Sequence, residues 1–302
     1  MENKLLVSCV IPTFNRGEKI GNAVESVRNQ SYKNLEILVV DDQSPDNTKD
    51  VVAELAKSDA RIKYLLNPVK GANNARNYGI LNAKGDFIAF LDDDDVWLEP
   101  KIEKQIKAIQ EADDKCGVVF CSFLRKKINS NSTRIHPSRF SGIKNGNILN
   151  KLLKRNFIGT PTLFIKAEVF KKSGLFNPSY KSFQDWELLI RIAKHYNFCF
   201  LREPLVKVFE SGDSITLNKK NRALTSFRIL KQNRELYQNK PRLLSYRYCA
   251  IGFSFLKIKH KRAARLFLYR SLKHNFLNIE ALFYLFVLLF LNSDNKKPAL
   301  KK

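Results

Sequence analysis

The chain has 302 residues, enough for one large domain and a smaller appendage, and 44% of them are hydrophobic, which excludes a chain that is disordered throughout. Lys and Arg outnumber Asp and Glu by 53 to 29, giving a formal net charge of +24. A balance this basic favours an anionic partner, such as anionic lipid or nucleic acid.

The first hundred residues alternate between apolar runs and segments with helical spacing. The apolar run that ends at Pro12 is typical of a buried strand, and Ile20, Ala23, Val24 and Val27 recur at the spacing of one helix face. This alternation with short connections predicts an α/β fold, with a mostly parallel sheet covered by helices. Strands are expected at Leu5–Ile11, Leu35–Val40, Arg61–Leu66 and Phe87–Leu91, and helices at Glu18–Gln30, Asp46–Lys57, Ala72–Ala83 and Pro100–Ala112.

The middle of the chain is less regular. Residues Asn129–Asn150 are rich in Ser, Asn, Gly and Arg, which predicts a long loop that serves as a lid or an acceptor-binding segment. Beyond it we expect a strand at Pro161–Lys166, an amphipathic helix at Trp186–Tyr196 and an extended segment at Phe198–Val208. After Leu217 the sequence becomes basic and helix-prone, which indicates a domain boundary there.

Two of the predicted strands end in acidic residues. Asp41 and Asp42 follow one of them, and the run Asp92–Asp95 follows another. Ligands of open α/β sheets bind outside the carboxyl ends of the strands. Four consecutive carboxylates repel one another, and a divalent cation would relieve that repulsion. The run therefore predicts a metal site, although the same acids could cap the helix near Pro100, and Asp41–Asp42 alone also suits a turn.

Four segments stand in the order and at the spacings found in family 2 glycosyltransferases of the GT-A (Rossmann-like) fold, and the chain resembles that family from residue 5 to about residue 217. The segments are VSCVIPTFNR (7–16), SYKNLEILVVDDQSPDNT (31–48), GANNARNYGILNAKGDFIAFLDDDD (71–95) and FQDWELLIR (183–191). The resemblance implies transfer of a sugar from a nucleotide-diphosphate sugar to an acceptor hydroxyl with inversion at the anomeric carbon. It also implies a place in bacterial cell-surface polysaccharide biosynthesis, such as that of capsule or O-antigen.

The resemblance assigns donor binding to residues that follow the first two strands and to one on the helix of residues 72–83. Phe14 would stack on the base, Asp42 would accept a hydrogen bond from it, and Arg76 would lie near the base or the phosphates. The nucleotide-sugar-binding residues expected in this region are Pro12, Thr13, Phe14, Asn15, Asp41, Asp42 and Arg76.

The resemblance also assigns the acid run. Asp92, Asp93 and Asp94 would form a DxD-type motif that meets the donor. Asp94, together with Asp92, would hold a divalent metal, Mg or Mn, through carboxylate oxygens.

On the acceptor side, Asp185 matches the general base of the family's acid-Asp-Trp motif. Gln184 stands where the family often has Glu, which removes a neighbouring charge from the base. Asp95 and Trp186 are expected beside the acceptor, although packing in the core is the alternative role of Trp186.

One further segment departs from the family pattern. Many relatives have Arg and His over the diphosphate at the positions of Val208–Thr216, where this chain has Glu210 and Ser211. Arg202 or Lys207 could take over that charge.

Three other classes of protein fit parts of the pattern. A nucleotidyltransferase acting on sugar phosphates would need a Gly-rich phosphate loop after the first strand, where this chain has Pro12 to Arg16. A glycoside hydrolase would use two opposed carboxylates and no nucleotide pocket. A nucleic-acid-binding protein would suit the charge, but no signature of a binding module is visible, so we expect no nucleic-acid partner.

The resemblance and the change in composition divide the chain into a catalytic domain, residues 1–217, and a basic α-helical region, residues 218–302. Residues 219–302 contain twenty Lys or Arg and three acids, a net charge of +17. We expect this region to contact the inner face of the plasma membrane, where a glycan or lipid-linked glycan acceptor would lie. The apolar run Ala281–Leu291 is too short to cross a bilayer, so it is either a buried packing helix or an in-plane anchor.

The cysteines and the first residues bear on location. The five cysteines form no CxxC pair, and four of them lie in apolar stretches, which favours buried thiols in a reducing compartment. The apolar part of MENKLLVSCVIP is too short for a signal peptide. We therefore expect the catalytic domain in the cytosol, and the sequence indicates no oligomeric state.

Overall fold

The computed structural model describes residues 5–127, 132–138, 141–210 and 218–293. The chain forms two compact units, and each is built from segments that are not continuous in the sequence. Unit 1 comprises Met1–Leu152, Phe157–Ser179 and Gln184–Ser214, and unit 2 comprises Leu153–Asn156, Tyr180–Phe183 and Ile215–Lys302. The predicted boundary at residue 217 lies outside the described residues and stays a prediction.

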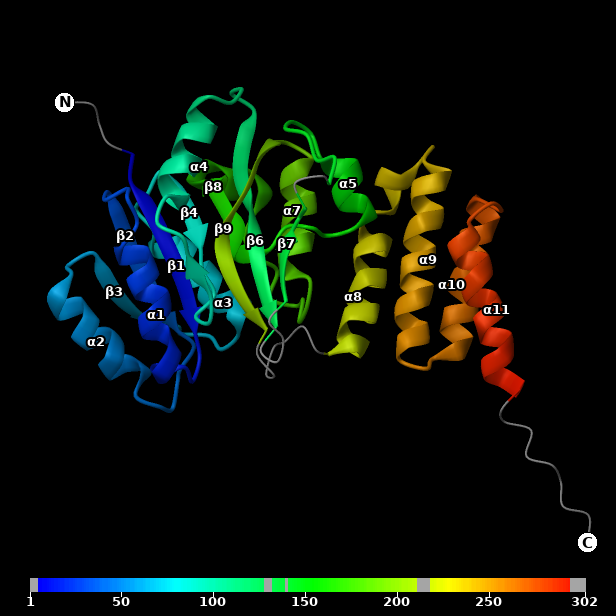
Figure 1. Cartoon of the computed structure of the whole chain (residues 1–302), viewed down its shortest axis with the longest axis horizontal. Coiled ribbons are helices and arrows are strands. Elements are labelled where there is room, and N and C mark those ends of the chain that lie inside the picture. Colours follow the sequence, from blue (N-terminus) through cyan, green and yellow to red (C-terminus); the bar gives the residue numbers. More distant parts are fainter. Residues whose placement is uncertain (1–4, 128–131, 139–140, 211–217, 294–302) are drawn as a thin grey trace, which may run out of the picture. The chain divides into compact units, whose positions relative to one another are not determined.

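The first half of unit 1 is the expected parallel sheet. β1 (Val7–Thr13), β2 (Leu35–Asp41), β3 (Ile62–Leu66) and β4 (Phe87–Phe90) pair side by side in the order β3-β2-β1-β4 (Figure 1). Every residue of β1, β2 and β4 is buried, as expected of strands covered on both faces.

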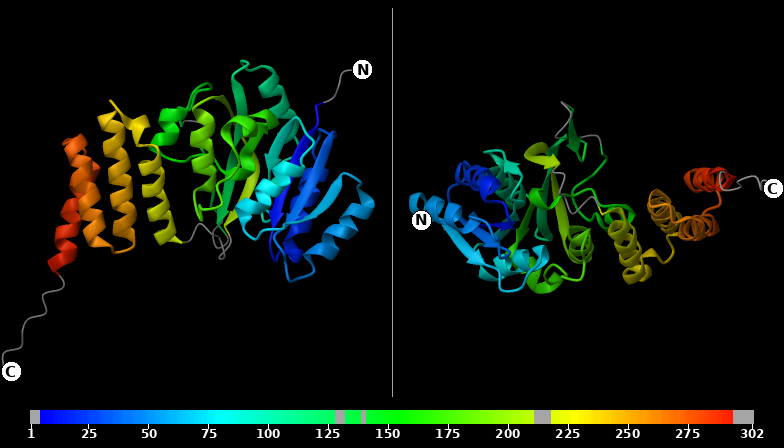
Figure 2. Two further views of the ribbon diagram at one scale, coloured as in Figure 1. Left: turned by 180° about the vertical axis from the view of Figure 1, so that it is seen from behind. Right: turned by 90° about the horizontal axis from the view of Figure 1, so that it is seen from below.

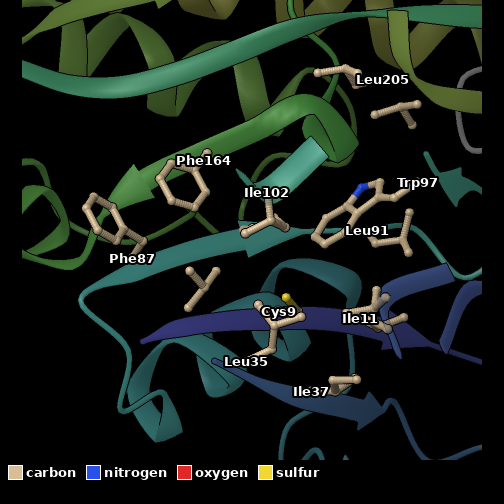
Figure 3. Close-up of a cluster of buried hydrophobic side chains, with 14 of the residues drawn as sticks. Cys9, Ile11, Leu35, Ile37, Phe87, Leu91, Trp97, Ile102, Phe164 and Leu205 are labelled. Atoms are coloured by element: carbon tan, nitrogen blue, oxygen red, sulfur yellow. The ribbon is translucent and has the colours of Figure 1, made fainter. Parts of the chain in front are cut away.

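Helices cover both faces of this sheet. α1 (Gly17–Arg28), α2 (Thr48–Ser58) and α4 (Lys101–Gln110) contribute to the core that contains Cys9 and Ile11 of β1 (Figure 3). α3 (Ala72–Asn82) covers the opposite face, where Gly79 lies against Val10. Neighbouring residues of a strand point to opposite faces, which explains why Val10 meets α3 while Cys9 does not.

The second half of the sheet is mixed. β8 (Leu163–Lys166) pairs antiparallel with β4, and β6 (Cys116–Lys127) and β9 (Asn197–Glu210) continue the sheet as a parallel pair. The short β5 (Val96–Trp97) pairs antiparallel with β9 at the edge. The remaining helical segments of unit 1 are α5 (Leu149–Lys154), which runs into unit 2, η1 (Thr160–Thr162), α6 (Ala167–Ser173) and α7 (Gln184–Ala193).

The prediction of one long loop at Asn129–Asn150 was wrong in part. β7 (Thr133–His136) pairs antiparallel with β6, with His136 opposite Phe123. The strand was missed because its exposed polar side chains lack an apolar alternation. Residues 128–131 and 139–140 of this segment lie outside the described residues.

Unit 2 is helical, as expected. Its elements are α8 (Lys219–Gln232), η3 (Arg234–Tyr237), α9 (Pro241–Lys257), α10 (Lys261–His274) and α11 (Ile279–Ser293), which lie side by side in Figure 2. α9 and α10 approach closely at Gly252, where an added Cβ would come within 2.9 Å of Leu268. Among the described residues, no helix is long and apolar enough to cross a bilayer.

All five cysteines are buried and unpaired, which confirms the expectation of buried thiols.

Candidate active site

The carboxyl ends of β1, β2 and β4 lie side by side and carry the residues that the sequence singled out. Thr13 ends β1, Asp41 ends β2 directly opposite it, and the acid run Asp92–Asp95 follows β4. The edge of the sheet thus gathers three segments that are far apart in the chain, as expected for the ligand side of an open α/β sheet.

Two interactions tie the acid run to its neighbours. The Thr13 hydroxyl donates a hydrogen bond to the Asp93 carboxylate at 2.8 Å. The Arg76 guanidinium on α3 forms an ion pair with Asp92 at 2.7 Å. Residues expected to bind the donor nucleotide and residues expected to meet its phosphates therefore belong to one network.

Arg76 has hydrogen-bonding capacity left over. It is 7% exposed, and its Nε and Nη1 atoms are buried with no hydrogen-bond partner among the described residues. Its guanidinium carbon lies 5.8 Å from the centre of the Phe176 ring. Buried N–H groups without an acceptor cost free energy, so this side chain is well suited to an anionic ligand that would supply acceptors.

The acid run has an excess of negative charge. Burial raises the pKa of Asp93 to about 6, and the charges of Asp94 and Asp92 add to that effect against the hydrogen bond from Thr13. Burial and the charges of Asp92 and Asp94 raise the pKa of Asp95 to about 9, although Phe209 donates its backbone N–H to that carboxylate at 3.1 Å. A cation at this end of the sheet would offset the repulsion.

The described residues include no group of three or more His, Cys, Asp or Glu side chains arranged to hold a metal ion. The carboxylates of the acid run nevertheless have the right chemistry for Mg or Mn, which are commonly held by one or two carboxylates together with substrate phosphates. Asp92 and Asp93 have the protein partners given above, and Asp94 is half-buried and lines the cavity described below together with Asp93. The side chains fit a metal that the donor helps to bind.

The two acids at the end of β2 organise the loops around the site. Asp41 is buried and accepts hydrogen bonds from the Tyr64 hydroxyl at 2.7 Å and from the backbone N–H of Ser44 at 2.9 Å. Asp42 accepts from the Asn67 amide at 2.6 Å and from the backbone N–H of Gly71 at 2.8 Å. Gly71 has φ 125°, a conformation that favours glycine, and it directly precedes α3. The predicted contact of these acids with a base stays a prediction.

The loop after β1 presents an aromatic ring. Pro12 is buried within β1, whereas Phe14 is 49% exposed, with the Lys70 ammonium 5.8 Å from its ring centre. Asn15 has φ 54°, and its backbone N–H donates to the Ser44 hydroxyl at 2.8 Å. This turn holds an exposed ring at the carboxyl end of β1, a surface on which a base can stack.

A cavity of about 640 Å³ adjoins the acid run on the side of α1. Its lining comes from three parts of unit 1: α1, the segment of the acid run and β5, and the end of β9. The residues are Lys19, Asn22, Glu25, Ser26, Asn29, Asp93, Asp94, Asp95, Val96, Trp97, Leu98, Glu99 and Phe209. The contribution of α1 could not be predicted, because polar residues on the outer face of a helix are the ordinary pattern.

Asp185 and Trp186 lie in the first turn of α7, in unit 1. The Asp185 carboxylate accepts the backbone N–H of Trp186 at 2.8 Å, and Asp185 is not among the described residues that line the cavity. Trp186 is buried, and its indole donates to the backbone carbonyl of Leu152 at 2.7 Å. That environment suits the packing role left open for Trp186, and its role beside an acceptor stays a prediction.

The segment Val208–Thr216 can be followed only to Glu210, because residues 211–217 lie outside the described residues. Lys207 on β9 pairs through its backbone with Val96, the residue that follows Asp95, and its side chain is exposed. Lys207, one of the two cations proposed to replace the family's Arg and His, therefore lies opposite the residue that directly follows the acid run.

Comparisons with known proteins agree with this geometry. Residues 8–174 match the sequence model described as glycosyl transferase family 2. The chain is 32% identical to the GalNAc(5)-diNAcBac-PP-undecaprenol beta-1,3-glucosyltransferase of Campylobacter jejuni, over 78% of this chain and 75% of that protein. It is 35% identical to the UDP-Glc:alpha-D-GlcNAc-diphosphoundecaprenol beta-1,3-glucosyltransferase WfgD of Escherichia coli, over 71% of this chain and 81% of that protein.

A third relative is longer. An uncharacterised glycosyltransferase of Rickettsia conorii is 35% identical over 73% of this chain, and the match spans only 35% of the relative's own length.

Two solved structures share the fold. TarS of Staphylococcus aureus matches with a TM-score of 0.63 at 19% identity, over 89% of this chain and 49% of TarS. A mannosyltransferase of Pyrobaculum calidifontis, solved with GDP-Man and Mn²⁺, matches with a TM-score of 0.60 at 19% identity, over 94% of this chain and 80% of that protein. These likenesses concern the fold, and they confirm the predicted GT-A arrangement.

Proposed function

The chain belongs to glycosyl transferase family 2, and from this membership we propose that it is an inverting glycosyltransferase that moves a sugar from a nucleotide-diphosphate sugar to an acceptor hydroxyl. The product would be a cell-surface polysaccharide such as a capsule, an O-antigen or a similar glycan. The named relatives support this setting, because their names describe glucosyl transfer to undecaprenol-linked sugars.

The buried guanidinium of Arg76 is the observation that carries the proposal. Two of its nitrogen atoms are buried and find no acceptor in the part of the chain that the structure describes, while its third contacts Asp92. The diphosphate of a nucleotide sugar would supply oxygen atoms there, and the exposed ring of Phe14, which follows the neighbouring strand β1, would take the base. A neutral ligand would offer these N–H groups weaker acceptors than the oxygen atoms of a diphosphate.

The donor site would hold Mg or Mn through Asp94, with Asp92 as the second ligand and the remaining positions filled by phosphate oxygens and water. Such an ion offsets the charge that grows on the departing nucleoside diphosphate. Thr13 keeps Asp93 turned toward β1, and Arg76 keeps Asp92 turned toward α3, so the run is held in place for both donor and cation.

The chemical step would be a single displacement. Asp185 takes the proton of the acceptor hydroxyl, the hydroxyl oxygen forms a bond to the anomeric carbon, and the bond from that carbon to the diphosphate oxygen breaks. The sugar inverts its configuration, and no sugar–enzyme bond forms. The role of Asp185 is supported by its match to the family motif at the start of α7.

The acceptor would be a glycan, or a glycan linked to a lipid diphosphate, as in the names of the Campylobacter and Escherichia relatives. Such an acceptor lies at a membrane surface. We therefore place the chain at the inner face of the plasma membrane, in peripheral contact through residues 219–302.

Of the alternatives, a nucleotidyltransferase has less support. β1 ends in Thr13 and is followed by Phe14 and Asn15 in place of a Gly-rich phosphate loop. A nucleic-acid-binding role has only the net charge in its favour.

Turnover of a panel of nucleotide sugars tests the proposal. Purified protein with Mn²⁺ is expected to release a nucleoside diphosphate from one donor class, to release it faster when an undecaprenyl-diphosphate-linked sugar is added, and to lose turnover when EDTA is added. Release of pyrophosphate from a nucleoside triphosphate and a sugar phosphate, without turnover of any nucleotide sugar, would instead identify a nucleotidyltransferase.

A further inference from the structure

The outer face of α11 is apolar and exposed. Five large side chains recur along it at helical spacing, and each is between 48% and 79% exposed. They are Ile279, Leu282, Phe283, Phe286 and Leu289. Phe276 and Leu277, in the turn before the helix, are 75% and 67% exposed. A contiguous group of this size is unusual on a freely solvated surface and marks a contact site.

The inner face of the same helix is firmly packed. Ala281 and Leu288 are buried, and Tyr284 stacks on Phe253 of α9 with ring centres 4.5 Å apart. The helix therefore already has a packed side, and the exposed side chains are a second apolar face.

A small polar network fixes the point where α11 begins. The Asn278 amide donates to the Ser245 and Ser271 hydroxyls, both at 3.0 Å, and these serines lie buried on α9 and α10. The Asn278 side-chain oxygen also accepts the backbone N–H of Ala281 at 3.2 Å. The turn that contains Phe276 and Leu277 is thus anchored at its end, and its apolar side chains are held in the solvent.

The exposed positions of α10 carry positive charge among apolar groups. Arg262, Arg265, Arg270 and Lys273 are exposed, and Leu266 and Tyr269 are exposed between them. Over residues 219–293 sixteen Lys or Arg accompany only two acids. An interfacial helix segment that binds anionic lipid has this combination of cationic and apolar side chains.

We propose that Phe276, Leu277 and the outer face of α11 insert into the headgroup region of an anionic bilayer, while the cations of α10 contact the lipid phosphates. The charge selects this occupant. A second copy would bring an equally basic helix segment against the first, whereas anionic lipid complements it. α11 is too short to span the bilayer, so it lies in the plane of the membrane. This inference rests on the proposed function in one respect, which is that the lipid-linked acceptor lies at the same membrane.

Vesicle flotation of the full chain tests the proposal. In low salt the wild-type protein is expected to float with phosphatidylcholine vesicles that contain 30% phosphatidylglycerol (a composition of roughly physiological charge), and to stay at the bottom with phosphatidylcholine alone. The double substitution Phe283→Ser, Phe286→Ser should reduce the floating fraction at least roughly tenfold, because it removes two of the inserting rings. Leu81→Ser, at an exposed leucine of α3, should float like the wild type.

Two results would overturn the proposal. One is flotation of the α11 double variant at the wild-type level, and the other is a wild-type protein that stays at the bottom with anionic vesicles in low salt. If sedimentation velocity then showed a dimer that the double variant loses, the face would be a contact between copies.

Flotation requires no nucleotide sugar, so its failure is distinct from failure of the proposed reaction. The double variant is expected to turn over donor with a short-chain, water-soluble acceptor at the wild-type rate.

Discussion

Among single residues, one side chain at the end of β1 and one on α3 contact the acid run. The Thr13 hydroxyl donates a hydrogen bond to Asp93, and Arg76 forms an ion pair with Asp92. A substitution at the end of β1 or in α3 should therefore shift these carboxylates. Asp94, the metal ligand that the family resemblance implies, lines the cavity beside Asp93 and Asp95. Binding of donor and metal should therefore be coupled, since each supplies part of the other's site.

Replacing Asp94 tests that coupling. Asp94→Asn keeps the shape of the side chain but removes its charge, so Mn²⁺-dependent binding of the nucleoside diphosphate should weaken roughly tenfold or more. Calorimetry with UDP or GDP and Mn²⁺ measures it. Asp114→Asn, an exposed acid in the loop before β6, is the matched control and should bind like the wild type. An unchanged Mn²⁺-dependent affinity in Asp94→Asn would rule out Asp94 as a ligand.

Asp185 is predicted to act on the chemistry and not on the donor. Asp185→Asn should bind nucleoside diphosphate normally and lose sugar transfer by roughly a hundredfold or more, as expected when a general base is removed. Steady-state turnover together with the same calorimetry separates the two effects. Near-normal turnover would reassign the base, with Asp95 as the next candidate.

Residue type and position alone singled out the acids after β2 and β4, and the family resemblance singled out Phe14. Neither identified the partners of these side chains. The hydrogen bonds of Asp41 and Asp42 involve Tyr64 and Asn67, which come from other segments. A polar residue in a strand or turn has no pattern that identifies its partner, so the organising role of these two acids could not be predicted.

At the scale of elements, α3 holds Arg76 in place by packing closely on the sheet. Gly79 makes this possible, because an added Cβ would lie 2.4 Å from Val10 Cγ1 and 3.2 Å from Val40 Cγ2. Both neighbours belong to buried strands, so they cannot move away easily.

Gly79→Ala should therefore lower the free energy of unfolding by about 1–3 kcal/mol, as expected when a packed core is overfilled. Gly21→Ala is the matched control on α1, where an added Cβ meets no atom within 4 Å, and it should raise stability by about 0.5–1 kcal/mol. Urea unfolding of the three proteins measures both changes. A stabilised Gly79→Ala variant would show that α3 does not lie this close to β1.

α4 carries a buried cation. Lys101 is fully buried, its ammonium donates to Gln105 at 2.7 Å, and it lies 3.7 Å from the centre of the Trp97 ring. Burial lowers the pKa of Lys101 to about 8. An unfolded lysine has a pKa near 10.4, so below pH 8 the need to hold the charged form lowers the stability of the folded state. This loss of stability disappears as the pH rises from about 8 to 10.4.

The variant Lys101→Met removes this loss of stability at all pH values. Its free energy of unfolding should exceed that of the wild type at pH 7, and the difference should shrink by about 2 kcal/mol between pH 7 and pH 10. Urea unfolding of both proteins at the two pH values measures the difference, and groups common to both cancel. A difference that is the same at both pH values would contradict a depressed pKa.

The elements themselves were predicted unevenly. Apart from the two-residue β5, which was not predicted, the strands and helices up to Gln110 were expected within two residues or so at most ends, because apolar runs and helical spacing alternate cleanly there. The twelve-residue β6, the polar β7 and the short α6 were not predicted, since their identity depends on pairing and packing within the second half of the sheet.

At the scale of the whole molecule, the chain combines two units with different chemistry. Unit 1 carries the acid run, the buried guanidinium and the exposed ring, and unit 2 carries an apolar helix face among basic side chains. Composition alone indicated that the C-terminal part of the chain is basic, because the positive charge is concentrated after residue 218. The choice between a buried helix and an in-plane anchor for Ala281–Leu291 needed the structure: Ala281 and Leu288 are buried, while Leu282, Phe283 and Leu289 are exposed.

We propose that the chain forms a glycosidic bond by a single displacement on a nucleotide sugar. The configuration of the product distinguishes this reaction from its alternatives. Wild-type protein would be incubated with Mn²⁺, the ¹³C-labelled α-linked nucleotide sugar that it turns over, and a lipid-linked acceptor, and the anomeric carbon of the product would be examined by NMR. A single displacement is expected to leave a β-linked sugar on the acceptor. An α-linked product, or labelled free sugar with no glycoside formed, would contradict it.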